Sequence, residues 1–209
     1  MNIIEGLKWR YATKIFDASK KVSKENLDYL KEAISLIPSS YGLQPYKVLV
    51  IENPAIREKL RKAAWGQAQL TEASHIFLFC NFTAMEPDKI DEFLNRGAAI
   101  NNYDPATTKG YGDMMKGQMA GMTSEQIINW TSKQTYIALG SLLAAASELR
   151  IDSCPMEGFD KAKFDEILGL KEKGLTASVL GAVGYRSAED SHQFLKKVRK
   201  PMKDLFEMI

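Results

Sequence analysis

The chain has 209 residues, of which 45% are hydrophobic and 26% are charged. These proportions are ordinary for a globular domain and exclude a disordered or fibrous chain. The 28 basic and 26 acidic side chains leave a formal charge of only +2, which excludes a general electrostatic field for nucleic acid. The length, without a linker or a repeat, predicts one domain over residues 1–209.

The small number of cysteines and histidines limits which cellular compartment and which kind of metal chemistry we expect. Cys80 and Cys154 are far apart and form no CxxC pair, which favours a reducing compartment. His75 and His192 are the only histidines, so we expect no metal site. No run of about 18 apolar residues could span a membrane. We therefore expect a cytoplasmic protein with neither a membrane nor a nucleic-acid partner.

The first half of the chain predicts helices alternating with two strands. Asn2 opens a short helix, with Glu5 at the spacing of a capping box. Ser23 caps a second helix, which Pro38 ends. The elements expected next are a strand over 46–51, a helix opened by Asn53 and Pro54, a strand over 75–80 and a helix starting at Pro87.

The second half contains the longest helical pattern. Residues 101–122 hold four glycines and four methionines without a clear period, so we expect a mobile excursion of the kind that often covers a site. Thr123 or Ser124 caps a helix to about Arg150, and its stretch 137–146 is apolar almost all round, which predicts a central buried helix. A strand over 151–156, a short helix from Asp160 to Gly169, a core strand over 177–185 and a polar C-terminal arm follow. This order predicts a single α+β domain.

Glycine patterns do not supply a nucleotide site. The sequence has neither GxGxxG nor GxxxxGK[ST], the two commonest phosphate-binding turns. Gly181 and Gly184 lie inside an apolar strand, where close packing or a bulge is the simpler explanation. A basic run over 196–200 would, taken alone, be a solvated tail. A bound nucleotide would therefore need a phosphate-binding site of another kind.

Four segments together resemble the nitroreductase family, in the form called oxygen-insensitive NAD(P)H nitroreductase or dihydropteridine reductase. They are RYATKIFD (10–17), PSSYGLQP (38–45), PMEGFD (155–160) and LKKVRKP (195–201). The resemblance covers almost the whole chain. It implies a central, mostly antiparallel sheet flanked by helices, a long buried central helix, and an extended C-terminal arm exchanged in a homodimer with flavin sites at the interface.

The resemblance also implies a flavin mononucleotide (FMN) site. Arg10, Lys197 and Arg199 would hold the phosphate, for which guanidinium geometry is suited. Lys14 would face the pyrimidine edge and stabilise the negative charge of the reduced ring, as the principal electrostatic catalyst. The backbone N–H of Glu157 would point at flavin N5. Without the other segments, Glu157 would be an ordinary turn carboxylate.

The remaining implied contacts surround the ring. Pro38, Ser39 and Ser40 would reach the cofactor largely across the subunit interface, and Gln67 or Gln69 would face flavin N3 and O4, with Gln67 slightly favoured. Ala12 departs from the family pattern because a hydroxyl contact to phosphate is missing. The other positions implied are Tyr11, Pro155, Met156 and Gly158 for the cofactor, and Tyr41, Met114 and Met115 for the substrate.

The implied activity is reduction of nitroaromatics, quinones or similar acceptors by NADH or NADPH, by ping-pong hydride transfer through flavin N5. A specialised flavoenzyme on the same scaffold, such as a reductive dehalogenase, and a non-catalytic FMN-binding module are the alternatives. A nucleic-acid-binding protein is a weaker one, because the basic arm has little aromatic interleaving. The sequence leaves the acceptor and the choice of nicotinamide donor open.

Overall fold

The computed structural model describes residues 2–209, which form a four-stranded antiparallel sheet in the order β1-β2-β4-β3. In the central strand β2, Phe77 and Phe79 face one side, and Ile76 and Leu78 face the other. Successive strand residues point to opposite faces, so both faces of this sheet are apolar and need cover. The strands are β1 (Tyr46–Ile51), β2 (His75–Phe82), β3 (Asp152–Met156) and β4 (Leu175–Gly184).

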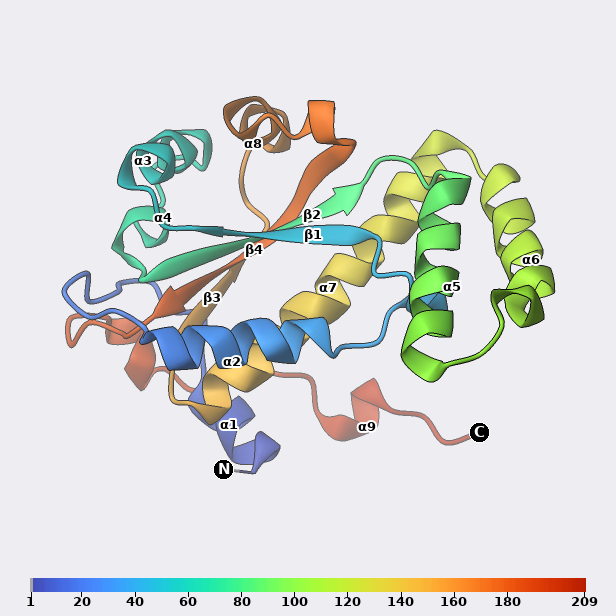
Figure 1. The fold of residues 1–209 in the computed structure, drawn as a ribbon. Helices are drawn as coiled ribbons and strands as arrows, with labels where there is room; N and C mark the ends of the chain where they lie inside the picture. The colour runs from blue at the N-terminus through green and yellow to red at the C-terminus, as the bar shows by residue number, and fades with distance from the viewer. Residues whose placement is uncertain (1) are drawn as a thin grey trace.

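Helices supply the cover on both faces. Figure 1 shows α2 and α7 on one face of the sheet and α3 and α8 on the other. This layered arrangement confirms the predicted α+β class. The helices are α1 (Ile3–Trp9), α2 (Lys24–Ser35), α3 (Pro54–Ala63), α4 (Gln69–Glu72), α5 (Pro87–Asn101), α6 (Lys109–Ala120), α7 (Ser124–Glu148), α8 (Lys161–Leu168) and α9 (Met202–Leu205).

Two apolar clusters fill these layers. Leu30 of α2 and Leu142 of α7 pack against Phe77, while Leu60 of α3 and Phe164 of α8 belong to the cluster on the opposite face. All five side chains are fully buried. Burial of each contributes about 1.5–3 kcal/mol relative to exposure. The sheet is therefore a rigid base for the loops at its ends.

The predicted helix starts are confirmed, with one correction. Ser23, Asn53, Thr123 and Asp160 each accept a backbone N–H at the start of a helix. Asn2 also caps α1, by accepting from the Ile4 amide at 2.9 Å. The predicted capping box is wrong, however, because the Glu5 side chain does not bond back to the start of the helix. Glu5 forms an ion pair with Lys8 at 3.0 Å instead.

The long helix α7 is central, as predicted, but only one of its faces is buried. Leu139 and Leu142 pack on the sheet, whereas Tyr136 and Ile137 are 40% and 45% exposed. The close contact with the sheet needs a glycine, because a Cβ at Gly181 would lie 2.7 Å from Leu142 Cδ2. No helix within residues 2–209, α7 included, is long and apolar enough to cross a membrane.

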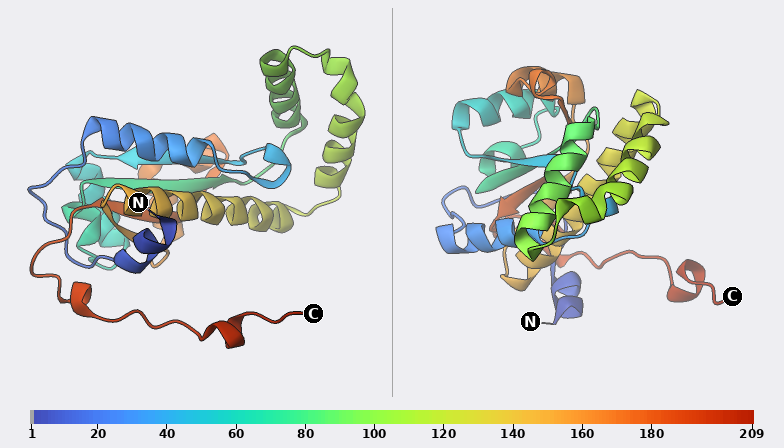
Figure 2. Two further views of the ribbon diagram at one scale, coloured as in Figure 1. Left: turned by 90° about the horizontal axis from the view of Figure 1, so that it is seen from below. Right: turned by 45° about the vertical axis from the view of Figure 1, so that its right-hand side comes forward.

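The methionine-rich segment, expected as a mobile excursion rather than core, is helical and partly buried. Most of it forms α6, which packs against α5. Figure 2 shows these two helices protruding together from the rest of the molecule. Met115 and Met119, four residues apart, are buried in a small cluster with Leu94. The glycines in this segment made its helical periodicity hard to recognise in the sequence. At least one of them allows close packing of α6 on α5, because a Cβ at Gly112 would lie 2.6 Å from Leu94 Cδ1.

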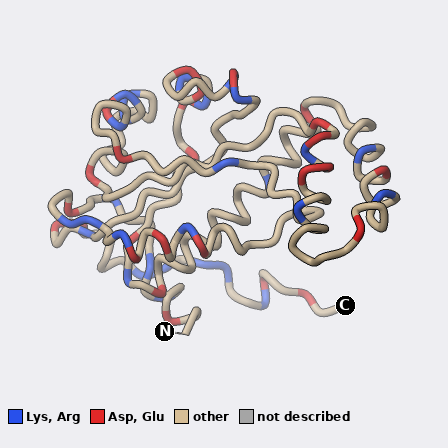
Figure 3. The backbone as a smooth tube through the Cα atoms, viewed as in Figure 1, with Lys and Arg blue, Asp and Glu red and all other residues tan. Residues whose placement is uncertain are grey.

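The C-terminal arm is extended, and most of it runs clear of the body of this chain (Figure 2). Its apolar side chains are open to solvent: Val198 is 88% exposed, Met202 76% and Phe206 63%. Lys and Arg positions gather at the start of the arm in Figure 3. The arm thus begins with a cluster of Lys and Arg residues and ends with exposed apolar side chains.

Candidate functional site

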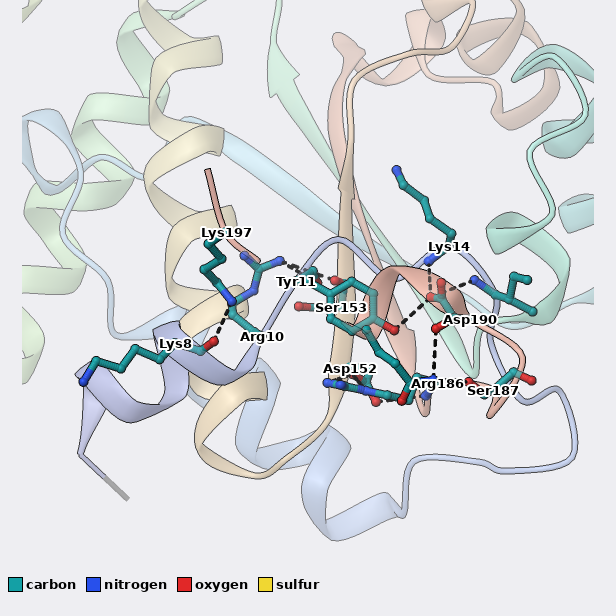
Figure 4. A network of polar contacts seen from close by, with 12 residues as sticks. Lys8, Arg10, Tyr11, Lys14, Asp152, Ser153, Arg186, Ser187, Asp190 and Lys197 are labelled. Atoms are coloured by element: carbon teal, nitrogen blue, oxygen red, sulfur yellow. Dashed lines mark hydrogen bonds and ion pairs between the residues drawn. The ribbon is translucent and has the colours of Figure 1, made fainter. Parts of the chain in front are cut away.

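The segment that follows α1 is fixed in place by one buried carboxylate. Asp190 is fully buried and accepts from the Tyr11 hydroxyl at 2.9 Å, the Lys14 amide at 2.8 Å and the Ile15 amide at 3.3 Å. Its second oxygen accepts from the His192 amide at 3.1 Å. Figure 4 shows Tyr11 and Lys14, from near the N-terminus, beside Asp190, from near the C-terminus.

These donors also set the charge state of Asp190. Burial alone raises the pKa of a carboxyl group, but the amide and hydroxyl donors around Asp190 outweigh it and hold its pKa below the usual value. Asp190 was not among the predicted site residues. In the sequence it stands in the polar stretch SAEDS, which has the pattern of a solvated turn.

A second buried acid fixes the end of α1. Asp152, at the start of β3, forms an ion pair with Arg186 in which Oδ1 contacts the guanidinium, with the Nε atom at 2.7 Å, and Oδ2 accepts from the Arg186 amide at 2.9 Å. The Arg186 guanidinium lies between two aromatic rings, 4.5 Å from the Trp9 centroid and 4.6 Å from that of Tyr11. Trp9 and Tyr11 flank Arg10, so this stack positions the arginine predicted to bind phosphate.

Arg10, Lys197 and Arg199, the three predicted phosphate ligands, come together from opposite ends of the chain. Arg10 donates to the carbonyls of Tyr11 and Ser153, and Lys197 donates to the Lys8 carbonyl at 2.5 Å. None of the three forms a salt bridge within residues 2–209. Burial lowers the pKa of Arg10 and of Lys197, and the neighbouring cations lower each further.

Three buried polar atoms beside this cation cluster lack a hydrogen-bond partner within residues 2–209, which bears on whether an anionic ligand fits there. Arg10 Nε, Thr13 Oγ1 and Ser153 Oγ have no hydrogen-bond partner in the described part of the chain. Buried polar atoms are normally satisfied. Three cations without an acidic partner, next to unpaired donors, fit the phosphate of a nucleotide such as FMN. Ala12, which offers no hydroxyl, bridges to Ser153 through its backbone.

Lys14 lies next to this cluster but points elsewhere. Its amide is held by Asp190, while its exposed side chain projects away from the polar network in Figure 4. Lys14 and Arg10 both act electrostatically on Cys154 of β3. Arg10, in the cation cluster, and Lys14, toward solvent, therefore both lie near Cys154 of this strand.

The turn after β3 is held by Gln67, the slightly favoured of the two predicted glutamines. Its Nε2 donates to the Gly158 carbonyl at 2.7 Å, whereas Gln69 is buried at 7% exposure. Trp65 approaches the same turn, since a Cβ at Gly158 would lie 3.3 Å from its Cζ3 atom. Glu157 is exposed at the tip of the turn. Gln67 thus touches the predicted cofactor turn directly.

Two further features define what this turn can offer a ligand. Met156 is 5% exposed and belongs to the core, so only its backbone is available, and Pro155 is half-buried. Tyr136 of α7 lies near Glu157; burial and this neighbouring carboxylate raise the pKa of Tyr136 to about 12. The exposed face of α7 is therefore contiguous with the turn.

The loop over residues 38–40 does not join the cation cluster in the same chain. It follows the end of α2, whereas Arg10 and Lys14 precede the start of that helix, and 12 helical residues span about 18 Å. The Ser40 amide donates to Gln134 Oε1, and Ser39 Oγ accepts from the Gln44 amide, both at 2.8 Å. Pro38 is exposed.

The predicted substrate residues are divided by the structure. Tyr41 has a left-handed φ of 57° and lies in an aromatic group, 6.4 Å from Tyr111 and 6.3 Å from Trp130 between ring centroids. Met114 is 47% exposed on α6, but Met115 is fully buried. The placement of Met115 at an open mouth is wrong, because its thioether packs into the cluster between α5 and α6.

Metal-ligating residues do not gather. No group of three or more His, Cys, Asp or Glu side chains in residues 2–209 has an arrangement that could hold a metal ion. Burial raises the pKa of both Cys80 and Cys154, which keeps these thiols protonated.

Comparison of the sequence gives a consistent family assignment. The model of the nitroreductase family matches residues 7–185. A candidate NAD(P)H nitroreductase of Staphylococcus saprophyticus is 36% identical, over 99% of this chain and 96% of its own. A candidate NAD(P)H nitroreductase of Bacillus subtilis is 38% identical over 88% of each chain.

Solved structures share the fold at lower identity. A candidate NAD(P)H:FMN oxidoreductase of Staphylococcus epidermidis superimposes with a TM-score of 0.89 at 21% identity, covering 100% of this chain and 96% of its own. A candidate nitroreductase of Exiguobacterium sibiricum, solved in complex with FMN, has a TM-score of 0.84 at 20% identity, covering 100% and 98%. These similarities confirm the predicted nitroreductase-like fold.

Proposed function

Because the chain belongs to the nitroreductase family, we propose that it is an FMN-dependent oxidoreductase that transfers electrons from NADH or NADPH to nitroaromatics, quinones or similar acceptors. The observation that carries this proposal is the cluster of Arg10, Lys197 and Arg199, which lack acidic partners within residues 2–209. The complex of a structural neighbour with FMN supports the choice of cofactor.

The cation cluster is the phosphate end of the proposed site. The Arg10 guanidinium would bind phosphate oxygens in a bidentate manner, and Lys197 and Arg199 would add charge from the arm. Arg10 is held ready by the Trp9–Arg186–Tyr11 stack, so little ordering accompanies binding. Bound FMN would supply the two-electron redox chemistry that the side chains lack.

The ring end of the proposed site is built from Lys14 and the turn after β3. Lys14 would stabilise the negative charge of a reduced ring, and its backbone is fixed for this role by Asp190. The Glu157 amide would face the ring at the position that exchanges hydride, while Gln67 holds the turn through Gly158. These residues orient and stabilise, and no acid–base residue is needed.

A second copy of the chain would complete the site. The loop over 38–40 lies at the far end of α2 from Arg10, and the apolar residues of the arm, among them Val198 and Phe206, are uncovered. The exposed apolar face of α7, with Ile137 at 45%, adjoins the turn at Glu157. We infer a cytoplasmic homodimer in which each loop over 38–40 serves the partner's site.

Flavin binding tests the site itself. The purified protein should be yellow, and protein stripped of flavin should quench FMN fluorescence on titration. Replacing Arg199 by Ala should raise the Kd for FMN about tenfold or more, because a charge-assisted phosphate contact is lost. Lys200→Ala is the matched control, since it removes a neighbouring exposed cation. A colourless protein that ignores added FMN contradicts the proposal.

Turnover tests the activity. With menadione or a nitrofuran as acceptor, initial rates should give the parallel double-reciprocal lines of ping-pong kinetics. A protein that binds FMN but consumes no NADH or NADPH with any acceptor would be a flavin-binding module instead. Release of halide from halogenated phenols, without nitroaromatic reduction, would indicate a reductive dehalogenase. These outcomes separate the cofactor from the reaction.

A further inference from the structure

A cavity of about 580 Å³ opens between the start of α2, the end of β1, α3 and the start of β2. Its volume is in the range of small-molecule sites, about 300–1,000 Å³. The lining includes Lys21, Glu52, Arg57, Ser74 and His75. It shares no residue with the cation cluster or with the turn after β3, so it is a separate feature of the molecule.

Three polar side chains of the lining, Glu52, His75 and Ser74, are linked by hydrogen bonds. His75 Nε2 lies 2.6 Å from Glu52 Oε1, and His75 Nδ1 lies 2.9 Å from Ser74 Oγ. A carboxylate accepts only, so the neutral imidazole donates from Nε2 to Glu52 and accepts the Ser74 hydroxyl at Nδ1. His75 is 6% exposed and Ser74 4%. Ser74 and His75 therefore form a preformed polar floor, whereas the Glu52 side chain is 67% exposed.

The order Ser–His–Glu is also that of a nucleophilic relay, but this reading fails on geometry. Ser74 Oγ already accepts the Val22 amide at 2.8 Å and is almost completely buried. A nucleophile needs its oxygen free and accessible to the reacting carbon. The relay therefore shapes the cavity and does not attack a substrate.

Three cations line the cavity, and Arg57 and Lys21 give it its preference, because Lys24 is paired with Asp28 at 2.5 Å. Arg57 is 5% exposed and donates to the carbonyls of Leu70, Ala73 and Ser74. A guanidinium has five N–H donors, so two are left beyond these three bonds. Neither Arg57 nor Lys21 forms a salt bridge in the described part of the chain. Glu52 acts electrostatically on Arg57, but no carboxylate of residues 2–209 contacts the guanidinium directly, and a buried cation without a contacting carboxylate favours an anionic ligand.

The other lining residues restrict which anion fits. Val22, Leu27 and Pro54 form an apolar wall, which disfavours a fully hydrated inorganic ion. Glu52 and Glu58 also line the cavity, and their charges oppose a ligand with several negative charges. A single carboxylate on a compact apolar body satisfies both restrictions.

We propose that this cavity binds a small organic monocarboxylate, with its carboxylate on the side of Arg57 and Lys21 and its apolar body against Val22, Leu27 and Pro54. Binding places the carboxylate near both cations and removes apolar surface from water. The site is independent of electron transfer, so it stands whether or not the proposed FMN chemistry is correct.

The two histidines provide a site-specific measurement. His75 lines the cavity, whereas His192 lies outside it, beside the buried Asp190, with Nδ1 3.3 Å from that carboxylate. Imidazole proton resonances of the full protein, saturated with FMN, are assigned with His192→Gln. Benzoate is the probe, with benzamide as its uncharged analogue and inorganic phosphate as the anion without an apolar body.

Benzoate should shift the His75 resonance with a Kd on the order of 1 mM, and benzamide and phosphate should bind at least about tenfold more weakly. Lys21→Glu should weaken benzoate about tenfold, while Lys62→Glu, an equal charge change on an exposed lysine of α3, should not. An unmoved His75 resonance overturns the proposal, as does equal binding by phosphate or by the Lys21→Glu protein. A shift of His192 alone means that benzoate binds elsewhere.

Discussion

Replacing Asp190 by Asn removes one charge from a fully buried position and leaves the side-chain shape almost unchanged. One oxygen of Asp190 accepts from Tyr11, Lys14 and Ile15, and the other from the His192 amide. The amide oxygen of an asparagine can replace only one of these acceptors. The other position becomes an NH₂ group, which faces a donor.

The expected loss of stability follows from these bonds. Three charge-assisted bonds become neutral, each losing about 1 kcal/mol, and one buried donor is left unpaired at about 1–3 kcal/mol, partly offset because no charge is buried. We therefore expect Asp190→Asn to lower the free energy of unfolding by about 2–4 kcal/mol. At fixed protein concentration, the urea midpoint should fall by about 1–2 M.

The assay is urea unfolding followed by tryptophan fluorescence, with Glu189→Gln as the control. Glu189 is an exposed neighbour of the same charge, so its replacement should change stability by less than about 0.5 kcal/mol. Because the folded pKa of Asp190 lies below its unfolded value, its contribution is complete above about pH 4 and is lost as the pH falls through the folded pKa. Equal midpoints for Asp190→Asn and the parent near pH 7, or a difference that does not shrink as the pH falls below about 4, would refute the reasoning.

Three further predictions concern charge, assembly and the histidine. Lys14→Met should slow reduction of bound FMN by NADH about a hundredfold, with little change in FMN affinity, in anaerobic stopped flow; an unchanged rate would remove Lys14 from the site. Deletion of residues 195–209 should give a monomer by light scattering that retains little FMN, because the arm carries two of the phosphate cations; a stable dimer would count against arm exchange. Burial lowers the pKa of His75, and the Glu52 carboxylate partly offsets this lowering. Glu52→Gln should therefore lower the pKa of His75 further in an NMR titration. A rise in that pKa would contradict the assigned His75–Glu52 pair.

Patterns along the chain were sufficient for most elements. The strand over 46–51 has the bounds of β1, and the caps at Ser23, Asn53 and Asp160 start helices as predicted. Such signals are local, since a cap or an alternation is complete within a few residues. The α6 helix was missed because its glycines suggested a loop, while the contact that requires Gly112 lies on another helix.

The sequence by itself determined the α+β class, the family and the cations predicted for the phosphate, because these depend on local periodicity and on the order of four short segments. Only the tertiary structure decided that Asp190 is the buried centre of this region and that Met115 is core. It also showed that Ser74, His75 and Glu52 line a separate cavity. A polar residue in a turn has the same local pattern whether it is solvated or buried, and only long-range packing distinguishes the two.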